Sequence, residues 1–327
     1  APAAWHTARI VLVVQPPPLD MVPQMQPGAV LAGMFAPLRQ LALVRALAAA
    51  QVTALAMEFV PRISRAQALD VLSSQANLAG YEAVLLAATH APKIFPMLMT
   101  AAGTIAPARV LVIGAGVAGL QAIATARRLG AIVEAYDVRP AVKEQVQSLG
   151  ARFVELPLTS QTAEATGGYA RQQTDAERRQ QAELMAKHVI GADAVIATAA
   201  VFGKAPPLLV PADVVAQMQP GAVLVDLAAD ADAGRGNCEL TRPGEIHTTP
   251  NGITLVGLLN LPARVPVHAS QVYAANMQAL VELLVTRPEK DQPAQLRVDM
   301  TDEIVKGAAI THGGAIVNDL VRQAVGA

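Results

Sequence analysis

A glycine-rich turn between an apolar run and an Ala-rich stretch constrains this 327-residue chain more than any other feature. The run Val110–Ile113 predicts a buried strand, and Gln121–Leu129 predicts a helix. The turn between them reads Gly114-Ala115-Gly116-Val117-Ala118-Gly119. A G-x-G-x-x-G turn that leaves a strand and opens a helix is typical of dinucleotide-binding sites.

Each glycine has a physical role in such a turn. We expect Gly114 to permit the sharp turn, Gly116 to let backbone N–H groups approach a pyrophosphate, and Gly119 to let the helix lie against the sheet. The pyrophosphate would then lie near Val117, where unpaired N–H groups and the helix dipole favour an anion. The alternative is a glycine turn that serves only helix–strand packing.

A second apolar run, Ala131–Ala135, ends in Tyr136-Asp137-Val138-Arg139. The Asp137 carboxylate lies where it would accept hydrogen bonds from both hydroxyls of an adenosine ribose and would repel a 2′-phosphate. The pattern therefore favours NAD(H) over NADP(H). Arg139, two residues later, is the one feature that could favour NADP(H).

The composition limits the class of protein. A chain of 327 residues is long enough for two domains, and its formal net charge of −1 gives no electrostatic case for binding nucleic acid or an anionic membrane. Charged or polar residues interrupt every long apolar run, so we expect no membrane insertion. The single cysteine, Cys238, excludes an internal disulfide bond and suits a reducing compartment. The six histidines are scattered, so no metal site is predicted.

Apolar, β-branched runs alternate along the chain with stretches of helical period, which predicts the βαβ units of an α/β fold with parallel sheets. The predicted strands are Ile10–Val14, Ala29–Met34, Thr53–Phe59, Val110–Ile113, Ile132–Tyr136, Arg152–Glu155, Ala194–Thr198 and Ala222–Leu227. The predicted helices include Leu38–Ala50, Gln121–Leu129, Val142–Leu149 and Ala176–Val189.

One octapeptide occurs twice, as Gln24–Leu31 and as Gln217–Leu224. Both copies read QMQPGAVL, which predicts a Pro-Gly turn that leads into a buried strand. We infer that two related domains use the same crossover unit, with coincidence at a favourable turn as the alternative.

Two segments have the composition of exposed loops. Thr159–Thr174 is polar, contains Gly167-Gly168-Tyr169 and is too long for a plain connector, so we expect a functional lid or a disordered loop. Ala231–Gly252 is rich in turn residues and predicts a projecting hairpin or strand pair. Such a projection suggests a contact with another subunit, with surface decoration as the alternative.

Several blocks of sequence carry a family resemblance. Pro61–Gln67 leads into Asp70–Tyr81, and Phe95–Thr104 precedes the glycine turn. Shorter matching blocks are Gly167–Ala170, Gly236–Glu239 and Pro243–Ile246. Together they closely resemble the NAD(H)-binding component (domain I, alpha subunit) of proton-translocating NAD(P) transhydrogenases, a family related to the alanine dehydrogenases. The similarity runs from about Gln26 to Ile316.

This resemblance implies an α/β fold of two Rossmann-like, doubly wound parallel-sheet domains with a cleft between them. Residues 1–73 plus 263–327 would form the first, discontinuous domain, and residues 74–262 the NAD(H)-binding Rossmann domain. The chain lacks the family's N-terminal segment, so we expect the first domain to be N-terminally incomplete.

The resemblance also implies an activity and partners. In the family, hydride passes directly between NAD(H) in the cleft and NADP(H) held by a partner component. A membrane-embedded proton-channel component couples this transfer to proton translocation. We therefore expect a cytoplasmic homodimer, peripheral to the inner membrane through its partner subunits, that binds NAD(H) and neither binds nucleic acid nor inserts into the membrane.

The family's motifs assign roles to matched residues. The residues expected around the nicotinamide end, as catalytic residues, are Arg62, Gln67, Asp70 and Ser73. Gln67 would hold the two rings in reacting geometry, and Gly168 and Tyr169 belong to a mobile loop that closes over the nucleotide. The full set of expected cofactor contacts is Arg62, Ile63, Ser64, Arg65, Gln67, Gly114, Gly116, Val117, Gly119, Asp137, Val138, Arg139, Gly168, Tyr169, Gln181 and Ala200.

The spacing of Gln67, Asp70 and Ser73 predicts that the three side chains share one face of a helix. An exposed polar stripe is the alternative. For Arg62 and Arg65 the alternative is a pair of solvated charges at the start of a helix.

The chain departs from the family pattern at two loops. Ala200-Val201-Phe202 stand before Gly203-Lys204 where the family usually has Leu-Ile-Pro. The segment Asp230–Arg235 is longer than usual. These differences affect local loop contacts rather than the nucleotide site.

Two other functions remain open. An amino-acid or 2-oxo-acid dehydrogenase of the alanine dehydrogenase type would need an acid–base residue. Asp230 falls near the catalytic acid of that family and favours this alternative. The family's histidine is replaced here by Met34-Phe35-Ala36, and the missing histidine outweighs Asp230. A non-catalytic NAD(H)-binding module fits the glycine turn but leaves the cluster from Arg62 to Ser73 unexplained.

Overall fold

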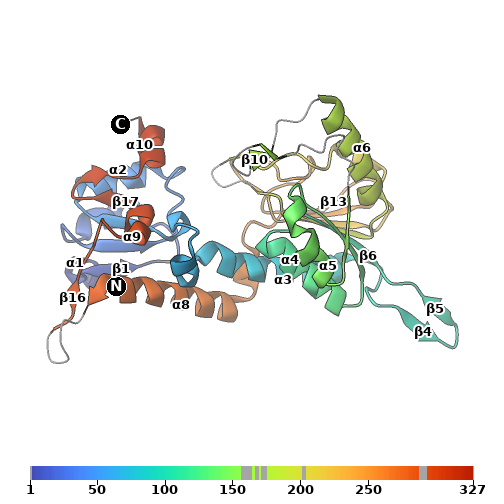
Figure 1. Ribbon diagram of the computed structural model, residues 1–327, viewed down its shortest axis with the longest axis horizontal. Coiled ribbons are helices and arrows are strands. Elements are labelled where there is room, and N and C mark those ends of the chain that lie inside the picture. Colours follow the sequence, from blue (N-terminus) through green and yellow to red (C-terminus); the bar gives the residue numbers. More distant parts are fainter. Residues whose placement is uncertain are drawn as a thin grey trace. The chain divides into compact units, whose positions relative to one another are not determined.

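The computed structural model (Figure 1) describes residues 2–155, 164–165, 169–170, 175–200, 204–286 and 293–326. The chain divides into two compact units. Unit 1 consists of Ala1–Gln75 and Val267–Ala327, and unit 2 consists of Ala76–Pro266. Each unit has its own sheet and its own hydrophobic core.

Unit 2 is built on a seven-stranded sheet with the order β13-β14-β12-β11-β6-β7-β8. Its strands are β6 (Arg109–Ile113), β7 (Ile132–Tyr136), β8 (Arg152–Phe153), β11 (Ala194–Ala197), β12 (Val223–Asp226), β13 (Ile246–Thr248) and β14 (Thr254–Val256). All neighbours pair in parallel except β13, which runs antiparallel to β14 at one edge.

The six parallel strands of unit 2 stand in the order 3-2-1-4-5-6 when they are counted along the chain. This is the order of a doubly wound, dinucleotide-binding sheet. The winding direction reverses between β6 and β11, and ligands of such sheets bind at the carboxyl ends of the strands at that point.

Helices cover both faces of this sheet, because its strands are apolar on both sides. They are α3 (Val71–His90), α4 (Val117–Arg128), α5 (Lys143–Ser148), α6 (Asp175–Ile190) and α7 (Ala212–Ala216). Val110 and Val112 of β6 join a core with α3, α4 and α5, whereas Leu111 and Ile113 join a core with α6 and α7. Successive side chains of a strand point to opposite faces, so a strand buried on both sides reads as a continuous apolar run.

Unit 1 has a five-stranded sheet with the order β1-β2-β3-β17-β18. Its strands are β1 (Ile10–Leu12), β2 (Val30–Gly33), β3 (Thr53–Ala56), β17 (Ala309–His312) and β18 (Ala315–Ile316). The first three pair in parallel, while β17 runs antiparallel to β3 and β18 antiparallel to β17. This sheet is therefore mixed, with its antiparallel strands at one side.

The helices of unit 1 are α1 (Pro2–Thr7), α2 (Leu41–Ala49), α8 (Pro266–Leu284), α9 (Glu303–Ala308) and α10 (Asp319–Val325). Side chains of α8 and α9 pack with Val30 and Leu55, and side chains of α2 and α10 pack with Leu31 and Ala54. Helices thus lie on both faces of a sheet with parallel strands in each unit, and the predicted α/β fold class is confirmed.

Short elements complete the described chain. The 3₁₀ turns are η1 (Leu19–Gln24), η2 (Met57–Phe59), η3 (Ser64–Leu69), η4 (Pro140–Val142) and η5 (Leu261–Arg264). The short strand pairs are β4 (Leu98–Thr100) with β5 (Gly103–Ile105), β9 (Glu164–Ala165) with β10 (Tyr169–Ala170), and β15 (Val285–Thr286) with β16 (Gln295–Leu296). No helix among the described residues is both long enough and apolar enough to cross a membrane.

The repeated octapeptide forms the same turn in both units. Gly28 and Gly221 have φ angles of +80° and +88°, which suit glycine. The Ala29 and Ala222 N–H groups each donate to the carbonyl three residues earlier, at 3.0 Å in both copies. One turn enters β2 and the other enters β12, so each feeds a buried parallel strand as predicted.

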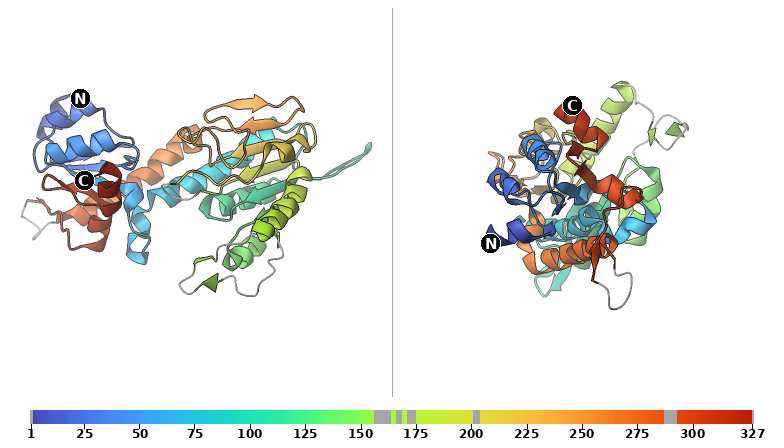
Figure 2. Two further views of the ribbon diagram at one scale, coloured as in Figure 1. Left: turned by 90° about the horizontal axis from the view of Figure 1, so that it is seen from above. Right: turned by 90° about the vertical axis from the view of Figure 1, so that its left-hand side faces the viewer.

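The projecting hairpin of unit 2 is not the one that the sequence predicts. Within Ala231–Gly252, Asn237 and Cys238 are fully buried, and β13 is an edge strand of the main sheet. The β4–β5 pair instead stands away from the body of unit 2 (Figures 1 and 2). The predicted projection of Ala231–Gly252 is therefore wrong, because polar side chains inside unit 2 hold this glycine-rich segment down.

The packing of α4 gives the first testable prediction. A Cβ atom on Gly119 would lie 1.8 Å from the Gly114 carbonyl oxygen, whereas one on Gly116 would have no atom within 4 Å. We expect Gly119→Ala to lower the free energy of unfolding by about 1–3 kcal/mol, as overpacking does. Gly116→Ala, the matched control, should cost clearly less. Urea unfolding of both variants measures this, and equal losses would contradict the packing described.

Candidate functional site

The glycine turn joins β6 to α4 at the point where the sheet reverses its winding. Gly114 has a φ of +96°, and a Cβ there would lie 2.5 Å from the Thr198 hydroxyl oxygen that follows β11. That hydroxyl donates to the Gly114 carbonyl oxygen at 3.0 Å. Gly114 and Gly119 are thus required by close packing, while Gly116 faces open space.

The amino end of α4 is free to receive an anion. The helix begins at Val117, and its N-cap residue, Gly116, has no side chain that could bond the first backbone N–H groups. The first N–H groups of a helix have no partner within the helix, and they carry the positive end of the helix dipole. The residues of this turn can therefore bind a phosphate group through backbone N–H donors.

The Asp137 carboxylate follows β7 and lies beside the glycine turn. Its Oδ2 accepts the Ala115 N–H at 2.7 Å and the Arg139 Nη2 at 2.9 Å. Its Oδ1 accepts the Arg139 backbone N–H and the Arg139 Nε, both at 2.9 Å. Burial alone would raise the pKa of Asp137, but these hydrogen bonds outweigh burial and hold the pKa below its ordinary value. Asp137 is therefore a carboxylate at neutral pH, with both oxygens occupied.

A buried asparagine positions the chain after β11. The Asn237 side chain accepts the Ala199 N–H at 3.0 Å and donates to the Ala199 carbonyl oxygen at 2.8 Å. This pairing fixes the backbone next to Ala200, an exposed residue that the family resemblance places against the cofactor. No local sequence pattern indicates this role of Asn237, because its partner lies 38 positions away in the chain.

Asp226, at the end of β12, has a structural role. The buried carboxylate accepts the Cys238 N–H at 2.9 Å and the Thr241 hydroxyl at 2.7 Å. A Cβ on Gly236 would lie 2.2 Å from this carboxylate, so only glycine fits there. Asp226 therefore holds the loop that carries Asn237 in place through these hydrogen bonds. Burial raises the pKa of the neighbouring Cys238 thiol to about 11.

In unit 1, a cavity of about 270 Å³ is lined by all four residues expected around the nicotinamide end, together with neighbouring residues of the same segment. Its lining residues are Pro61, Arg62, Ile63, Ser64, Ala66, Gln67, Asp70 and Ser73. We call this cavity the Arg62 pocket. The pocket contains one cationic side chain, Arg62, one carboxylate, Asp70, and the neutral amide of Gln67. Such a set of side chains can hydrogen-bond an uncharged amide. Its single acid, Asp70, accepts a hydrogen bond from Ser73 on each of its two oxygens.

The predicted helix face is corrected by the structure. Gln67 lies in the 3₁₀ turn η3, Asp70 ends that turn with φ −75° and ψ 83°, and Ser73 lies in α3, which begins at Val71. Asp70 caps α3, because its Oδ1 accepts the Ser73 N–H at 2.9 Å and its Oδ2 accepts the Ser73 hydroxyl at 2.6 Å. The three side chains share a pocket rather than one face of a single helix.

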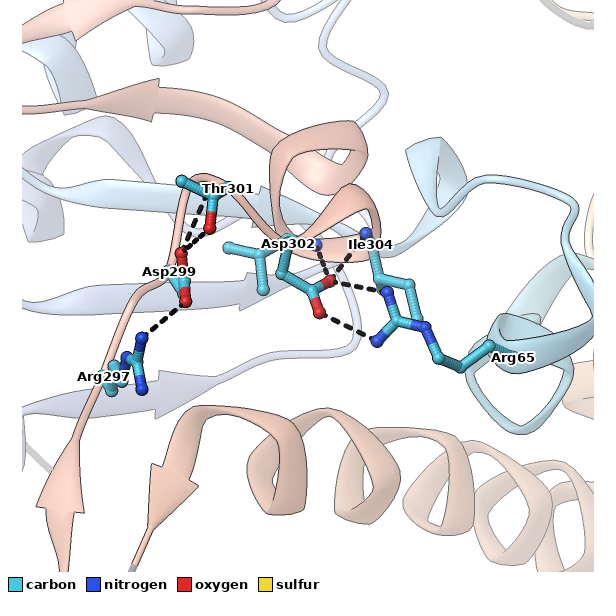
Figure 3. A network of polar contacts seen from close by, with 7 residues as sticks. Arg65, Arg297, Asp299, Thr301, Asp302 and Ile304 are labelled. Carbon is cyan, nitrogen blue, oxygen red and sulfur yellow. Dashed lines mark hydrogen bonds and ion pairs between the residues drawn. The ribbon is translucent and has the colours of Figure 1, made fainter.

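Arg65 does not line the Arg62 pocket. Its guanidinium forms two hydrogen bonds with the Asp302 carboxylate, at 2.8 and 3.2 Å (Figure 3). Asp302 also caps α9 by accepting the Ile304 N–H at 2.8 Å. The hydrogen bond from Arg65 lowers the pKa of Asp302. Arg65 therefore ties η3 to the start of α9, a structural role within unit 1.

The Glu58 carboxylate accepts hydrogen bonds from the backbone just after β2, and no sequence motif indicates this contact. The Phe35 and Ala36 N–H groups donate to Glu58 Oε1 at 2.8 and 2.6 Å, and Ala36 has a φ of +47°. Burial raises the pKa of Glu58.

Asp230 is the residue near the position of the alanine dehydrogenase acid. Its Oδ1 accepts the Asp232 and Ala233 N–H groups of its own loop.

Some expected residues lie where the structure gives partial or no information. Gly168 lies outside the described residues. Tyr169 and Gln181 are described by their backbones alone, in β10 and α6. Among the side chains that the structure describes, no group of three His, Cys, Asp or Glu residues could hold a metal ion.

Comparison with known proteins shows which family the chain belongs to. Residues 1–79 match the family described as "Alanine dehydrogenase/PNT, N-terminal domain", and residues 83–319 match "Alanine dehydrogenase/PNT, C-terminal domain". The first part of the NAD(P) transhydrogenase subunit alpha of Rhodospirillum rubrum is 47% identical over 300 residues, which cover 91% of this chain and 76% of that protein. The NAD(P) transhydrogenase subunit alpha of Haemophilus influenzae is 42% identical, and the chain spans 58% of its length.

Solved structures agree with these matches. A transhydrogenase from Sinorhizobium meliloti superposes with a TM-score of 0.81 at 41% identity, covering 98% of this chain and 82% of that one. An L-alanine dehydrogenase superposes with a TM-score of 0.76 at 23% identity, which shows a shared fold alone. The resemblance seen in the sequence is confirmed, and the chain belongs to the alanine dehydrogenase/PNT family, among the alpha subunits of NAD(P) transhydrogenase.

Proposed function

We propose that this chain is the NAD(H)-binding subunit of a proton-translocating transhydrogenase. It would pass hydride directly between NAD(H) and NADP(H) held by a partner component, and a membrane-embedded proton-channel component would couple this transfer to proton translocation. The observation that carries the proposal is the uncapped start of α4 beside the Asp137 carboxylate, at the winding reversal of a doubly wound sheet. The relatives are named as subunits of NAD(P) transhydrogenase, which supports a reaction between nicotinamide nucleotides.

Unit 2 supplies what the adenosine and pyrophosphate of NAD(H) require. The first N–H groups of α4, from Gly116 onward, would bind the pyrophosphate. The Asp137 carboxylate would accept the two ribose hydroxyls, and the exposed Val138 and Ala200 would lie against the adenosine. A carboxylate at this position disfavours a 2′-phosphate, which supports NAD(H) as the bound nucleotide.

We assign the nicotinamide end to the Arg62 pocket. Hydride transfer between two nicotinamide rings moves two electrons and one proton together, so neither carbon needs a general acid or base. The reaction depends instead on alignment of the rings and exclusion of water. Gln67, whose neutral amide can both donate and accept, would orient the ring. Ser73 donates two hydrogen bonds to Asp70, and these would hold the pocket wall.

The same geometry argues against an amino-acid dehydrogenase. Such an enzyme must protonate or deprotonate its substrate at a C=O or C=N group. No histidine or lysine is among the residues that line the described Arg62 pocket, and both oxygens of its Asp70 accept bonds from Ser73. At the end of β2, the buried Phe35 stands near the place of the alanine dehydrogenase histidine, and its N–H donates to Glu58.

One reconstitution separates the candidate functions. The protein is mixed with an NADP(H)-binding transhydrogenase component, NADPH or NADP⁺, NADH and an NAD⁺ analogue of distinct absorbance. Transfer from NADH to the analogue that requires both the partner and NADP(H) supports the proposal. Oxidation of NADH by pyruvate and ammonia without the partner would support an alanine dehydrogenase, and NADH binding with neither reaction would support a non-catalytic binding module.

We further propose a homodimer in which a second copy covers the β4–β5 hairpin. Met99 and Ile105 of this hairpin are exposed, and so is Met97 just before β4. The exposed fraction of Met99 is 77%. No charged residue lies between Ile94 and Ala108, and an isolated two-stranded ribbon is only marginally stable in water. A ribbon with unpaired edges can pair with its own copy about a two-fold axis, which makes a second copy a suitable partner.

The hairpin proposal predicts the effect of a charge. Met99→Asp should convert the dimer to a monomer, because it places a carboxylate in an apolar contact. Light scattering coupled to gel filtration gives the mass. Ile246→Asp, on the exposed edge strand β13, is the control and should leave the dimer intact. A wild-type monomer would refute the dimer, and a monomer from Ile246→Asp alone would move the contact to the segment Ala231–Gly252.

Shortening Gln67 tests the nicotinamide assignment. Gln67→Asn should slow hydride transfer on the order of 100-fold, because a displacement of about 1 Å in a reacting pair has an effect of this size. NADH affinity should change little, because the adenosine contacts remain. Stopped-flow transfer and equilibrium binding measure the two quantities, with the exposed Gln278→Asn on α8 as control. A large loss of affinity with unchanged transfer would remove the role assigned to Gln67.

Removing the Asp137 carboxylate tests the adenosine assignment. Asp137→Ala should weaken NADH binding by about 1–3 kcal/mol, the range of a lost charged hydrogen bond. Calorimetric titration of NADH measures this, and Asp213→Ala, an exposed change on α7 of the same unit, serves as control. Unchanged binding in Asp137→Ala would place the adenosine ribose elsewhere.

A further inference from the structure

Every acceptor position of the Asp137 carboxylate is occupied in this structure. Two backbone N–H groups, those of Ala115 and Arg139, take one position on each oxygen. The Nε and Nη2 atoms of Arg139 take one further position on each oxygen. A carboxylate offers about four lone-pair sites, so a ribose with two hydroxyl donors finds no vacant acceptor.

The four partners differ in how easily they can leave. The two backbone donors belong to the glycine turn and to the residue after Val138, so their positions are set by the fold. The Arg139 side chain is 59% exposed, whereas the Asp137 side chain is 6% exposed. Water can solvate the exposed guanidinium when the pair opens, which lowers the cost of breaking its two bonds. The guanidinium is therefore the exchangeable partner, and it makes two bonds, the number that a ribose diol would replace.

A guanidinium released from Asp137 would stay near a ribose bound there. The Arg139 backbone N–H bonds Asp137 Oδ1 independently of the side chain, and this bond would keep the start of the side chain beside the carboxylate. Lys143, the next cation along the chain, pairs with Glu155. A guanidinium binds phosphate oxygens with two parallel hydrogen bonds. The chain thus holds both an acid that suits a ribose diol and, two residues later, an arginine that suits a 2′-phosphate.

We propose that Arg139 is a displaceable cap on Asp137: it leaves the carboxylate when the adenosine ribose binds, and its guanidinium can then receive a 2′-phosphate. This inference rests on the proposed NAD(H) site and deepens it. Arg139 competes with NADH for the carboxylate and offsets the repulsion between Asp137 and NADPH. The preference for NADH over NADPH is consequently smaller than the carboxylate alone would give.

The test compares four proteins: the wild type, Arg139→Gln, Asp137→Asn and the double variant. NADH and NADPH are titrated into each full chain, and the ratio of the two dissociation constants is the readout. Arg139→Gln should tighten NADH about two- to fivefold, because the exposed guanidinium no longer competes for the carboxylate. It should also weaken NADPH, so that the preference for NADH rises roughly tenfold.

The carboxylate variant supplies the second half of the test. Asp137→Asn removes the negative charge and keeps the shape, so NADPH should gain at least about tenfold relative to NADH. The double variant should lose that gain, because the gain requires the guanidinium. Arg139 is exposed, so Arg139→Gln tests the cap even if Asp137→Asn folds poorly.

Two results overturn the inference. Weaker NADH binding in Arg139→Gln would show that the guanidinium is a direct contact rather than a cap. A gain for NADPH that persists in the double variant would show that Arg139 does not receive the 2′-phosphate. Either result leaves the proposed function intact if the wild type binds NADH. A wild type that binds neither nucleotide refutes the proposed function and this inference together.

Discussion

The close packing of α4 on the glycine turn is the constraint on which the rest of unit 2 depends. Gly119 lies so close to the Gly114 carbonyl oxygen that no Cβ fits between them. Thr198 braces the turn from β11 through its hydroxyl. These contacts aim the first N–H groups of α4 at the winding reversal of the sheet, and they bring the Ala115 N–H within 2.7 Å of Asp137. The proposed anion site and the proposed ribose acceptor are thus two consequences of one turn.

The central parts of this arrangement could be predicted from the sequence because their signals are local. A strand, a turn, a helix and a terminal acid occur within about 30 consecutive residues, and each carries its own pattern. All eight predicted strands overlap observed strands of the two sheets. The buried β11 and β12 read as apolar runs because both faces of the sheet are covered.

The remaining features could not be predicted, for physical reasons. Gln67, Asp70 and Ser73 look helical because three-residue spacing suits an α-helix and also a 3₁₀ turn, which has three residues per turn. The pairing of Arg65 with Asp302 joins positions 237 residues apart, and no local pattern reports such a contact. The projection predicted for residues 231–252 is wrong because turn residues look the same in an exposed loop and in a segment that buried polar side chains hold against the body of unit 2.

A crystal structure of this chain with NADH tests the proposed arrangement of the dinucleotide most directly. The diphosphate should lie against the first turn of α4, both adenosine ribose hydroxyls should donate to Asp137, and the nicotinamide ring should lie within the Arg62 pocket beside Gln67. A ring bound away from Gln67, or a diphosphate bound away from the start of α4, would contradict this arrangement.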